Sequence, residues 1–248
     1  MPKFEEHPLT WGLIIINIAV FILVFSLPNI EAVFDGLSFS WDTKFQVWRW
    51  FTSIFLHVSA SHLFFNMLGL FFFGKVLEKE LNRQWFLSVY FISGFIGSFV
   101  YMFTSPMPVV GASGCVFGVM GAAMLLNPIK RIHLYLFPLP LGIVAIAFVI
   151  FETMAVYYQP GMLQETSNVA HIAHLGGIMT GALFAMFNNF RRTMKGMLVL
   201  GVSVVLLIIL APVFALISGL AGIVLGVVDM LVGFVLYTLA KLLSLLWG

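Results

Sequence analysis

Uninterrupted apolar segments of about 20 residues recur along this chain, and they limit the folds open to it more than any other feature. A helix of that length crosses the roughly 30 Å hydrocarbon core of a bilayer. Hydrophobic residues make up 61% of the 248 positions and charged residues only 9%, whereas soluble domains carry about 25% charged residues. Strands of a membrane barrel would instead alternate polar and apolar residues over about ten positions. The sequence therefore predicts an all-α polytopic membrane protein.

The apolar segments predict eight membrane spans, or seven if the final segment forms an interfacial hairpin instead. The last two segments follow "RRTMK" and consist almost entirely of Val, Leu, Ile and Gly, with a predicted kink at Pro212 and a single acidic residue, Asp229. The predicted spans cover residues 11–27, 58–77, 84–103, 113–127, 132–156, 170–190, 196–217 and 220–240.

The distribution of positive charge predicts the orientation in the membrane, because cytoplasmic loops carry an excess of Lys and Arg. With the N-terminus in the cytoplasm, Lys44 and Arg49 are the only basic residues of the external segments. This orientation places Ser113 at the external end of the fourth span. Because acidic residues precede the first apolar segment and no small-residue cleavage site follows it, we expect this segment to be a first membrane span and not a removed signal peptide. The sequence shows no targeting features, so we expect a multi-pass protein of a prokaryotic plasma membrane. The cytoplasmic segments contain Lys3, Lys75, Lys79, Arg83, Lys130, Arg131, Arg191, Arg192 and Lys195.

Other classes of site and partner find little support in the sequence. The net charge is only +2, and the basic residues lie in short clusters between the spans. We therefore expect no nucleic-acid partner. Cys115 is the only cysteine, which excludes an intrachain disulfide. Four histidines (His57, His62, His171 and His174) raise the possibility of a metal site, but neither an HExxH motif nor a cysteine cluster accompanies them. We therefore expect no metal and no cofactor. Paired inverted repeats, typical of transporters, are also missing from the sequence.

The segment between the first two spans, residues 28–57, is rich in aromatic residues. Trp and Tyr are favoured at the membrane–water interface, so this segment is expected to lie in the headgroup zone and contact membrane lipid. The tetrapeptide "VWRW" would anchor it, with Arg49 reaching lipid phosphates.

A serine and a histidine on different spans are each followed by a series of glycines. Polar residues inside a span are costly and are functional candidates, and small residues let two helices approach closely. A neutral imidazole at hydrogen-bond distance from a serine hydroxyl activates it as a nucleophile. The glycines therefore predict a close helix contact that brings Ser113 and His174 together. The series are Gly114, Gly118 and Gly121 after Ser113, and Gly177 and Gly181 after His174.

Two further polar residues, His62 and Asn66, share one face of the second span because they are four residues apart. Both donate hydrogen bonds while neutral, so they are candidates for an oxyanion hole together with the Ser113 N–H. Neither Glu152 nor Asp229 is well placed to orient His174, which favours a Ser–His dyad without a third acidic member. Phe117, one turn after Ser113, is expected to hold the imidazole by ring stacking.

These motifs resemble those of the rhomboid intramembrane serine proteases over roughly residues 8–190. The resemblance rests on the order of three motifs on the second, fourth and sixth spans, and is supported by "VWRW" and by Glu78. The three motifs are "HLFFN" with His62 and Asn66, "GASG" from Gly111 to Gly114, and "AHLGG" with His174 and Gly177.

The resemblance implies a six-helix core, which we assign to residues 1–191, with a water-filled cavity that opens outward. It implies Ser113 as nucleophile, His174 as general base, and His62 with Asn66 around the oxyanion. It also implies substrates that are single-pass transmembrane proteins, cut near their external ends. This chain departs from the family in having Phe117 where a tyrosine is common, and in the one or two C-terminal hydrophobic helices of residues 192–248, whose role is open.

Two alternatives remain open at this point. Taken singly, each of these polar residues is better explained as a packing or hydrogen-bonding residue between helices. A noncatalytic protein that binds or escorts membrane helices would use the same fold.

Residues 156–170, "VYYQPGMLQETSNVA", are predicted to form a loop from their Pro, Gly and polar content, and we expect this loop to gate the cavity.

Overall fold

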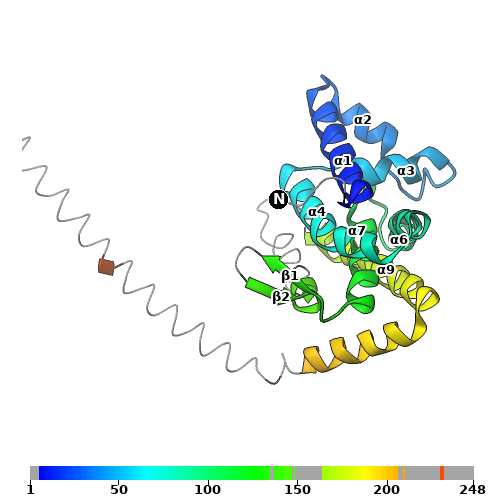
Figure 1. The fold of residues 1–248 in the computed structure, drawn as a ribbon. Helices are drawn as coiled ribbons and strands as arrows, with labels where there is room; N and C mark the ends of the chain where they lie inside the picture. Colours follow the sequence, from blue (N-terminus) through cyan, green and yellow to red (C-terminus); the bar gives the residue numbers. More distant parts are fainter. Residues whose placement is uncertain are drawn as a thin grey trace, which may run out of the picture. The chain divides into compact units, whose positions relative to one another are not determined.

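The structure, a computed structural model, describes residues 6–134, 137–146, 148, 164–205, 209, 230 and 231. Contacts divide the chain into two units, Met1–Leu200 and Gly201–Gly248, which are treated separately. The first unit contains nearly all of the described residues and is mostly helical (Figure 1).

The helices and strands of the first unit follow in one order along the chain. They are α1 (Pro8–Ser26), α2 (Ile30–Leu37), α3 (Val47–Phe55), α4 (Ala60–Gly69), the π-helical turn η2 (Leu70–Gly74), α5 (Lys75–Glu80), α6 (Arg83–Tyr101), α7 (Ser113–Leu126), β1 (Arg131–Leu134), β2 (Phe137–Pro140) and α9 (Gln164–Asn188). Residues 190–200 form a further helical segment after α9.

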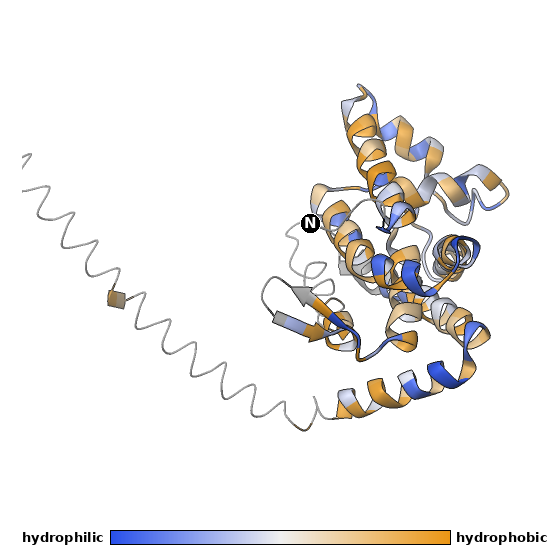
Figure 2. Ribbon diagram, in the orientation of Figure 1, coloured by the Kyte–Doolittle hydropathy of each residue, from blue (hydrophilic) through white to orange (hydrophobic). Residues whose placement is uncertain are grey.

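Three helices in the described part of the chain are long and apolar enough to cross a membrane. They are Pro8–Ser26, Ala60–Glu80 and Arg83–Tyr101, and Ser113–Leu126 is a shorter apolar helix. Hydrophobic residues run along most of α1 in Figure 2, and several of them, including Ile22 at 63% and Leu23 at 60%, are exposed as in a lipid-facing helix. The prediction of a mostly helical protein with several membrane helices is confirmed.

Helix α7 forms the centre of the first unit. It contacts α4, η2, α6 and α9, and every residue in it except Ser113 and Met124 is buried. Surface helices normally bury one face only. The glycines and alanines of α7 remove the side-chain bulk that would keep its neighbours away, so the helix that begins at Ser113 is enclosed on several sides.

A hairpin occupies the first part of the span predicted over residues 132–156. Strands β1 and β2 pair antiparallel, with Arg131 opposite Pro140 and Leu134 opposite Phe137. Pro138 and Pro140 have no N–H to donate within a helix, which is why an apolar segment here does not begin as one. Helical residues follow at 141–146 and 148. The predicted start of this span was wrong, and residues 149–156 lie outside the described part of the chain.

The predicted loop over residues 156–170 was also wrong in its second half. Residues 164–170 are helical and form the beginning of α9. Gln and Glu, which open this helix, are good helix formers despite their polarity. Residues 156–163 of the predicted gate lie outside the described residues, as do Glu152, Pro212 and Asp229. In the second unit the described residues 201–205, 209, 230 and 231 are all helical.

The aromatic segment before α4 folds as the two short helices α2 and α3. Its exposed aromatic side chains include Trp41, Phe45 and Trp48, with Phe45 85% exposed. The expected contact of Arg49 with lipid phosphates stays a prediction, and the structure adds contacts within the protein. The Nη1 of Arg49 donates to the carbonyl oxygens of Asp35 at 2.6 Å and Ser38 at 2.9 Å, and its Nε donates to the Gln46 side-chain oxygen at 2.6 Å. Arg49 therefore ties the segment together from inside.

Candidate active site

Ser113 is the first residue of α7 and follows a tight turn that only glycine fits well. Gly111 has φ +113°, a region that favours glycine, and its N–H donates to the carbonyl oxygen of Ser53 at 2.8 Å. A Cβ at Gly111 would lie 2.6 Å from Cε1 and 2.7 Å from Nε2 of His62. The absence of a side chain at Gly111 therefore lets the His62 ring lie against the turn that leads into Ser113.

His62 and Asn66 lie on α4, as their spacing predicted. Ser59 caps this helix by accepting a hydrogen bond from the His62 N–H at 3.2 Å. The Asn66 side chain is 5% exposed and donates one amide N–H to the His62 carbonyl oxygen at 2.8 Å. The ring edge of His62 that carries Nε2 faces Gly111, and its Nδ1 is buried without a hydrogen-bond partner among the described residues. The structure thus brings His62 beside the start of α7.

His174 lies on α9 and stacks on Phe117 of α7. The two ring centroids are 4.1 Å apart and the rings are within 3° of parallel, while His174 is only 5% exposed. The predicted stacking is present, although a phenyl ring stands where a tyrosine is common. Because Phe117 is one turn after Ser113 on the same helix, this contact fixes the imidazole at the Ser113 end of α7.

Glycines set the separation between α7 and α9. A Cβ added at Gly177 would meet the carbonyl oxygen of Gly114, and one added at Gly181 would meet that of Gly118. The predicted close contact of the two small-residue faces is therefore confirmed. Helix α6 joins them through Gly97, where a Cβ would lie 2.8 Å from the carbonyl oxygen of Ala173. This third helix was not predicted, although "SGFIGS" contains two glycines three positions apart, Gly94 and Gly97.

His57 is a site residue whose position the sequence did not reveal. Its Nε2 accepts a hydrogen bond from the Ala112 N–H at 3.4 Å, and its Nδ1 lies 3.3 Å from the carbonyl oxygen of Phe55. An accepting Nε2 leaves the proton on Nδ1, which then donates to Phe55. Burial, assisted by the neighbouring His62 imidazole, lowers the pKa of His57 to about 3. His57 is therefore neutral and holds the backbone of the residue before Ser113.

No metal cluster is evident in the part of the chain that the structure describes. There, no group of three or more His, Cys, Asp or Glu side chains is arranged to hold a metal ion. The polar groups of the site are the Ser113 hydroxyl, imidazoles beside the start of α7, and the Asn66 amide, which binds the His62 carbonyl oxygen. Such groups suit nucleophilic attack and hydrogen bonding to an oxyanion.

Fold and site together define a multi-pass helical membrane protein with buried polar side chains beside a serine at a helix start. Residues 44–189 match the rhomboid domain model, which is more than half of the chain. The chain therefore belongs to the rhomboid family, as the resemblance of its motifs indicated.

Curated relatives come from bacteria and from a mitochondrion. The chain is 29% identical over 193 residues to rhomboid protease GlpG of Pectobacterium atrosepticum, covering 77% of this chain and 66% of the relative. It is 32% identical over 194 residues to the mitochondrial rhomboid protein 1 of Saccharomyces cerevisiae, covering 74% and 55%. Rhomboid protease GlpG of Yersinia pseudotuberculosis is 28% identical over 197 residues, covering 78% and 68%. The chain thus spans roughly half to two thirds of the length of these relatives.

Proposed function

We propose that this protein is an intramembrane serine endopeptidase that cuts single-pass transmembrane proteins near the external membrane face. Ser113 is the nucleophile and His174 the general base of a Ser–His dyad. The observation that carries the proposal is the stacking of His174 on Phe117 at 4.1 Å, next to the glycine contact of Gly177 with Gly114. Both features hold the imidazole at the end of α7 where Ser113 begins the helix.

The reaction follows the usual course of acyl transfer. His174 takes the proton of the Ser113 hydroxyl as Oγ attacks the scissile carbonyl carbon, and the imidazolium then gives that proton to the departing amine. Water hydrolyses the resulting acyl-enzyme with His174 again acting as base. Phe117 takes the orienting role that a carboxylate has in a triad, because the stacked rings restrict rotation of the imidazole.

The oxyanion of the tetrahedral intermediate needs donors that are in place before it forms. We assign this role to the backbone N–H of Ser113, the His62 imidazole and the Asn66 amide. The His62 edge with Nε2 faces the Gly111 turn. Asn66 carries two amide N–H groups, of which one already donates to the His62 carbonyl oxygen, and the second is assigned to the substrate.

The orientation of the site is part of the proposal. The excess of Lys and Arg in the segments assigned to the cytoplasm puts the start of α7 on the external side. Hydrolysis needs water there, and polar backbone at membrane depth is tolerated only where it is buried or lines a hydrated cavity. The turn at Gly111 and Ala112, tied to Ser53 and His57, meets that requirement.

The test is cleavage of a model transmembrane substrate by the full chain in detergent micelles. We expect Ser113→Ala and His174→Ala each to lower the rate by about 10³-fold or more, since removing either member of such a pair disables the other. Ser93→Ala is the matched control, because Ser93 is a fully buried serine of the adjacent helix α6. This variant should cleave the substrate at the rate of the parent. Cleavage that persists in Ser113→Ala would reject the nucleophile, and a parent that binds the helix without cutting it would favour the noncatalytic alternative.

A further inference from the structure

A second concave site lies at the end of α7 away from Ser113. A pocket of about 740 Å³ opens between the residues that follow α7, including Pro128 and Lys130, and the helical segment 190–200, including Arg192 and Lys195. Because α7 has 14 residues and rises about 1.5 Å per residue, this pocket is about 20 Å along the helix from Ser113. It is therefore separate from the candidate active site.

Three cationic side chains line the pocket, and acidic groups neutralise only part of their charge. Glu80 forms ion pairs with Lys130 at 3.5 Å and with Arg192 at 2.8 Å, and Arg192 also donates to the side-chain oxygen of Asn127. The C-terminus of α7 adds about half a negative charge. The Lys195 side chain makes no ion pair or hydrogen bond to another described residue. The pocket thus keeps a surplus of more than one positive charge.

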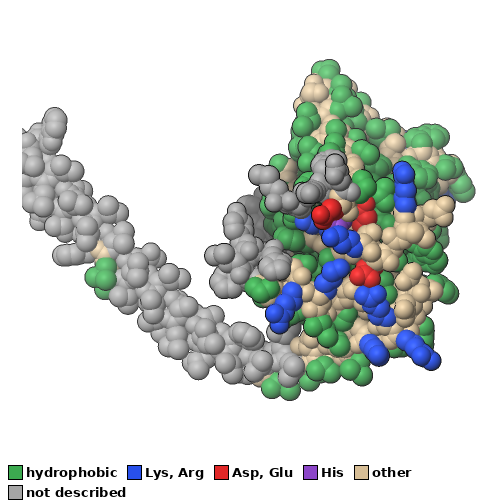
Figure 3. Space-filling model, in the orientation of Figure 1, with side chains coloured by type: hydrophobic (Ala, Val, Ile, Leu, Met, Phe, Trp, Pro, Cys, Tyr) green, Lys and Arg blue, Asp and Glu red, His purple; other side chains and the backbone are tan. Residues whose placement is uncertain are grey.

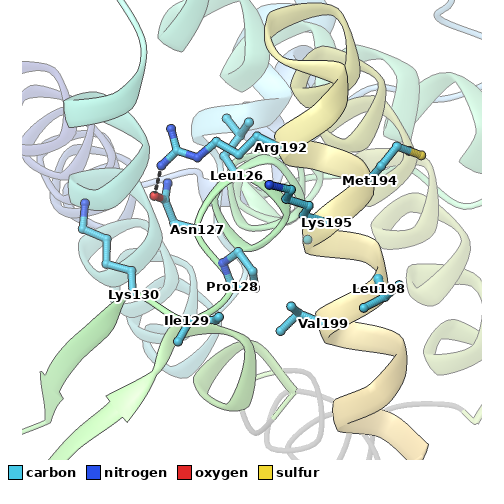
Figure 4. Close-up of a pocket in the computed structure, with 11 residues that line it drawn as sticks. Leu126, Asn127, Pro128, Ile129, Lys130, Arg192, Met194, Lys195, Leu198 and Val199 are labelled. Carbon is cyan, nitrogen blue, oxygen red and sulfur yellow. Dashed lines mark hydrogen bonds between the residues drawn. The ribbon is translucent and has the colours of Figure 1, made fainter.

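The remaining walls of the pocket are apolar and open to the surroundings. Pro128 and Ile129 line one side and Leu198 and Val199 the other (Figure 4). Ile129 is 65% and Leu198 69% exposed. The face drawn in Figure 3 shows Lys and Arg side chains gathered with a few acidic ones and bordered by hydrophobic atoms. A ligand that fits both the cationic side chains and the apolar walls carries a negative charge at one end and hydrocarbon at the other.

We propose that this pocket binds an anionic phospholipid, with its phosphate beside Lys195 and Arg192 and an acyl chain against Ile129 and Leu198. The chain is a multi-pass membrane protein, so this ligand surrounds it. The segments that hold Lys130 and Lys195 are assigned to the cytoplasmic side by their charge, and the cytoplasmic leaflet is the anionic one. An inorganic phosphate would satisfy the cations and leave the apolar walls exposed.

The test measures lipid retained by the full chain in neutral detergent micelles, with native mass spectrometry as the readout. The probes are dioleoyl phosphatidylglycerol, dioleoyl phosphatidylcholine and inorganic phosphate. We expect the protein to retain phosphatidylglycerol in clear preference to phosphatidylcholine. A Lys or Arg near an anionic surface contributes enough to change binding about fivefold, so Lys195→Gln should weaken phosphatidylglycerol binding by about that factor and Lys195→Arg should restore it.

Arg191→Gln is the matched control. Arg191 is an exposed cation on the same helical segment that does not line the pocket, so its loss should leave phosphatidylglycerol binding within twofold of the parent. Equal retention of the two lipids, an equal effect of Arg191→Gln and Lys195→Gln, or binding of inorganic phosphate without preference for the anionic lipid would each overturn the proposal. An unchanged melting temperature of Lys195→Gln separates lost binding from lost folding, and none of these readouts depends on proteolysis.

Discussion

At the scale of single residues, His57 organises the approach to Ser113. It joins the carbonyl oxygen of Phe55 to the N–H of Ala112 through its two ring nitrogens, which only the neutral imidazole can do. A protonated ring has two donors and no acceptor, so protonation would break the bond to Ala112. Because the side chain is 1% exposed, a charge there would also lack solvation.

This arrangement predicts how acid affects stability through His57. Its pKa is about 3 in the folded protein against 6.5 for the free side chain. Between these values the unfolded chain binds a proton that the folded one does not, so the free energy of unfolding falls as pH is lowered from about 6.5 toward 3. His57→Gln should lower the number of protons taken up on unfolding by up to one. This number is measured as the pH slope of the free energy of reversible unfolding in mixed micelles.

A neighbouring substitution supplies the comparison. Val58 is 43% exposed and carries no titratable group, so Val58→Ala should keep the pH slope of the parent. The same slope in His57→Gln and in the parent would mean that His57 is already protonated, or solvated, in the folded protein.

At the scale of elements, the contact between α7 and α9 holds the two helices of the proposed dyad at a fixed separation. Backbone meets backbone at Gly177 and Gly181, and the Phe117–His174 stack lies at the same face. Without a hydrophobic driving force between helices in lipid, such association depends on close packing. A methyl group added at either glycine would therefore overlap backbone atoms of α7.

Gly181→Ala should destabilise the protein and impair cleavage. The new methyl group meets the Gly118 carbonyl oxygen, and overpacking of this kind costs about 1–3 kcal/mol. A displacement of about 1 Å between reacting groups costs roughly 100-fold in rate, so substrate cleavage should fall by about that factor. Both quantities are measured on the same detergent preparation.

Gly12→Ala is the matched control, because Gly12 lies in the membrane helix α1 and a Cβ there meets no atom within 4 Å. It should be as stable as the parent, or slightly more so, because Ala favours a helix by roughly 1 kcal/mol over Gly. If the two glycine variants behaved alike, the tight contact of α7 with α9 would not be what positions the site.

At the scale of the whole first unit, acidic residues of α5 tie distant parts of the chain together. Glu78 accepts hydrogen bonds from the N–H groups of Leu9 at 2.8 Å and Thr10 at 2.9 Å, and from the Thr10 hydroxyl at 2.6 Å. These groups lie in the first turn of α1, whose N–H groups have no partner within the helix and whose dipole favours a negative charge. Glu78 thus fixes α1 to the core.

Glu78→Gln should lower the free energy of unfolding by about 1–3 kcal/mol, because it removes a charged acceptor from several buried or half-buried donors. Unfolding in mixed micelles measures this loss. Glu6→Gln removes an equally charged residue of the same region, but its ion pair with Lys79 is 52% exposed on both sides, and such pairs are worth about 0–1 kcal/mol. Equal losses in the two variants would contradict the capping role of Glu78.

How much of this was predictable depends on whether a feature follows a local pattern. The small residues after Ser113 and His174 recur at helical spacing, so the contact of their helices, and the stacking of Phe117, could be predicted. The hairpin of β1 and β2 could not be distinguished from a span by hydropathy alone, because only the lost N–H groups of Pro138 and Pro140 oppose a helix. Arg49 binds the carbonyl oxygens of Asp35 and Ser38, and His57 accepts from the Ala112 N–H, and these backbone groups are distant from the two side chains in the sequence. No sequence pattern records such groups.

Covalent labelling of the Ser113 hydroxyl measures whether His174 activates it as a nucleophile. The full chain in detergent micelles is treated with a fluorophosphonate, and the modified residue is mapped by peptide mass spectrometry. If His174 activates Ser113, we expect modification of Ser113 in the parent and in Ser93→Ala, and a large loss of that modification in His174→Ala. A parent unmodified at Ser113, or modified there equally well without His174, would contradict this activation.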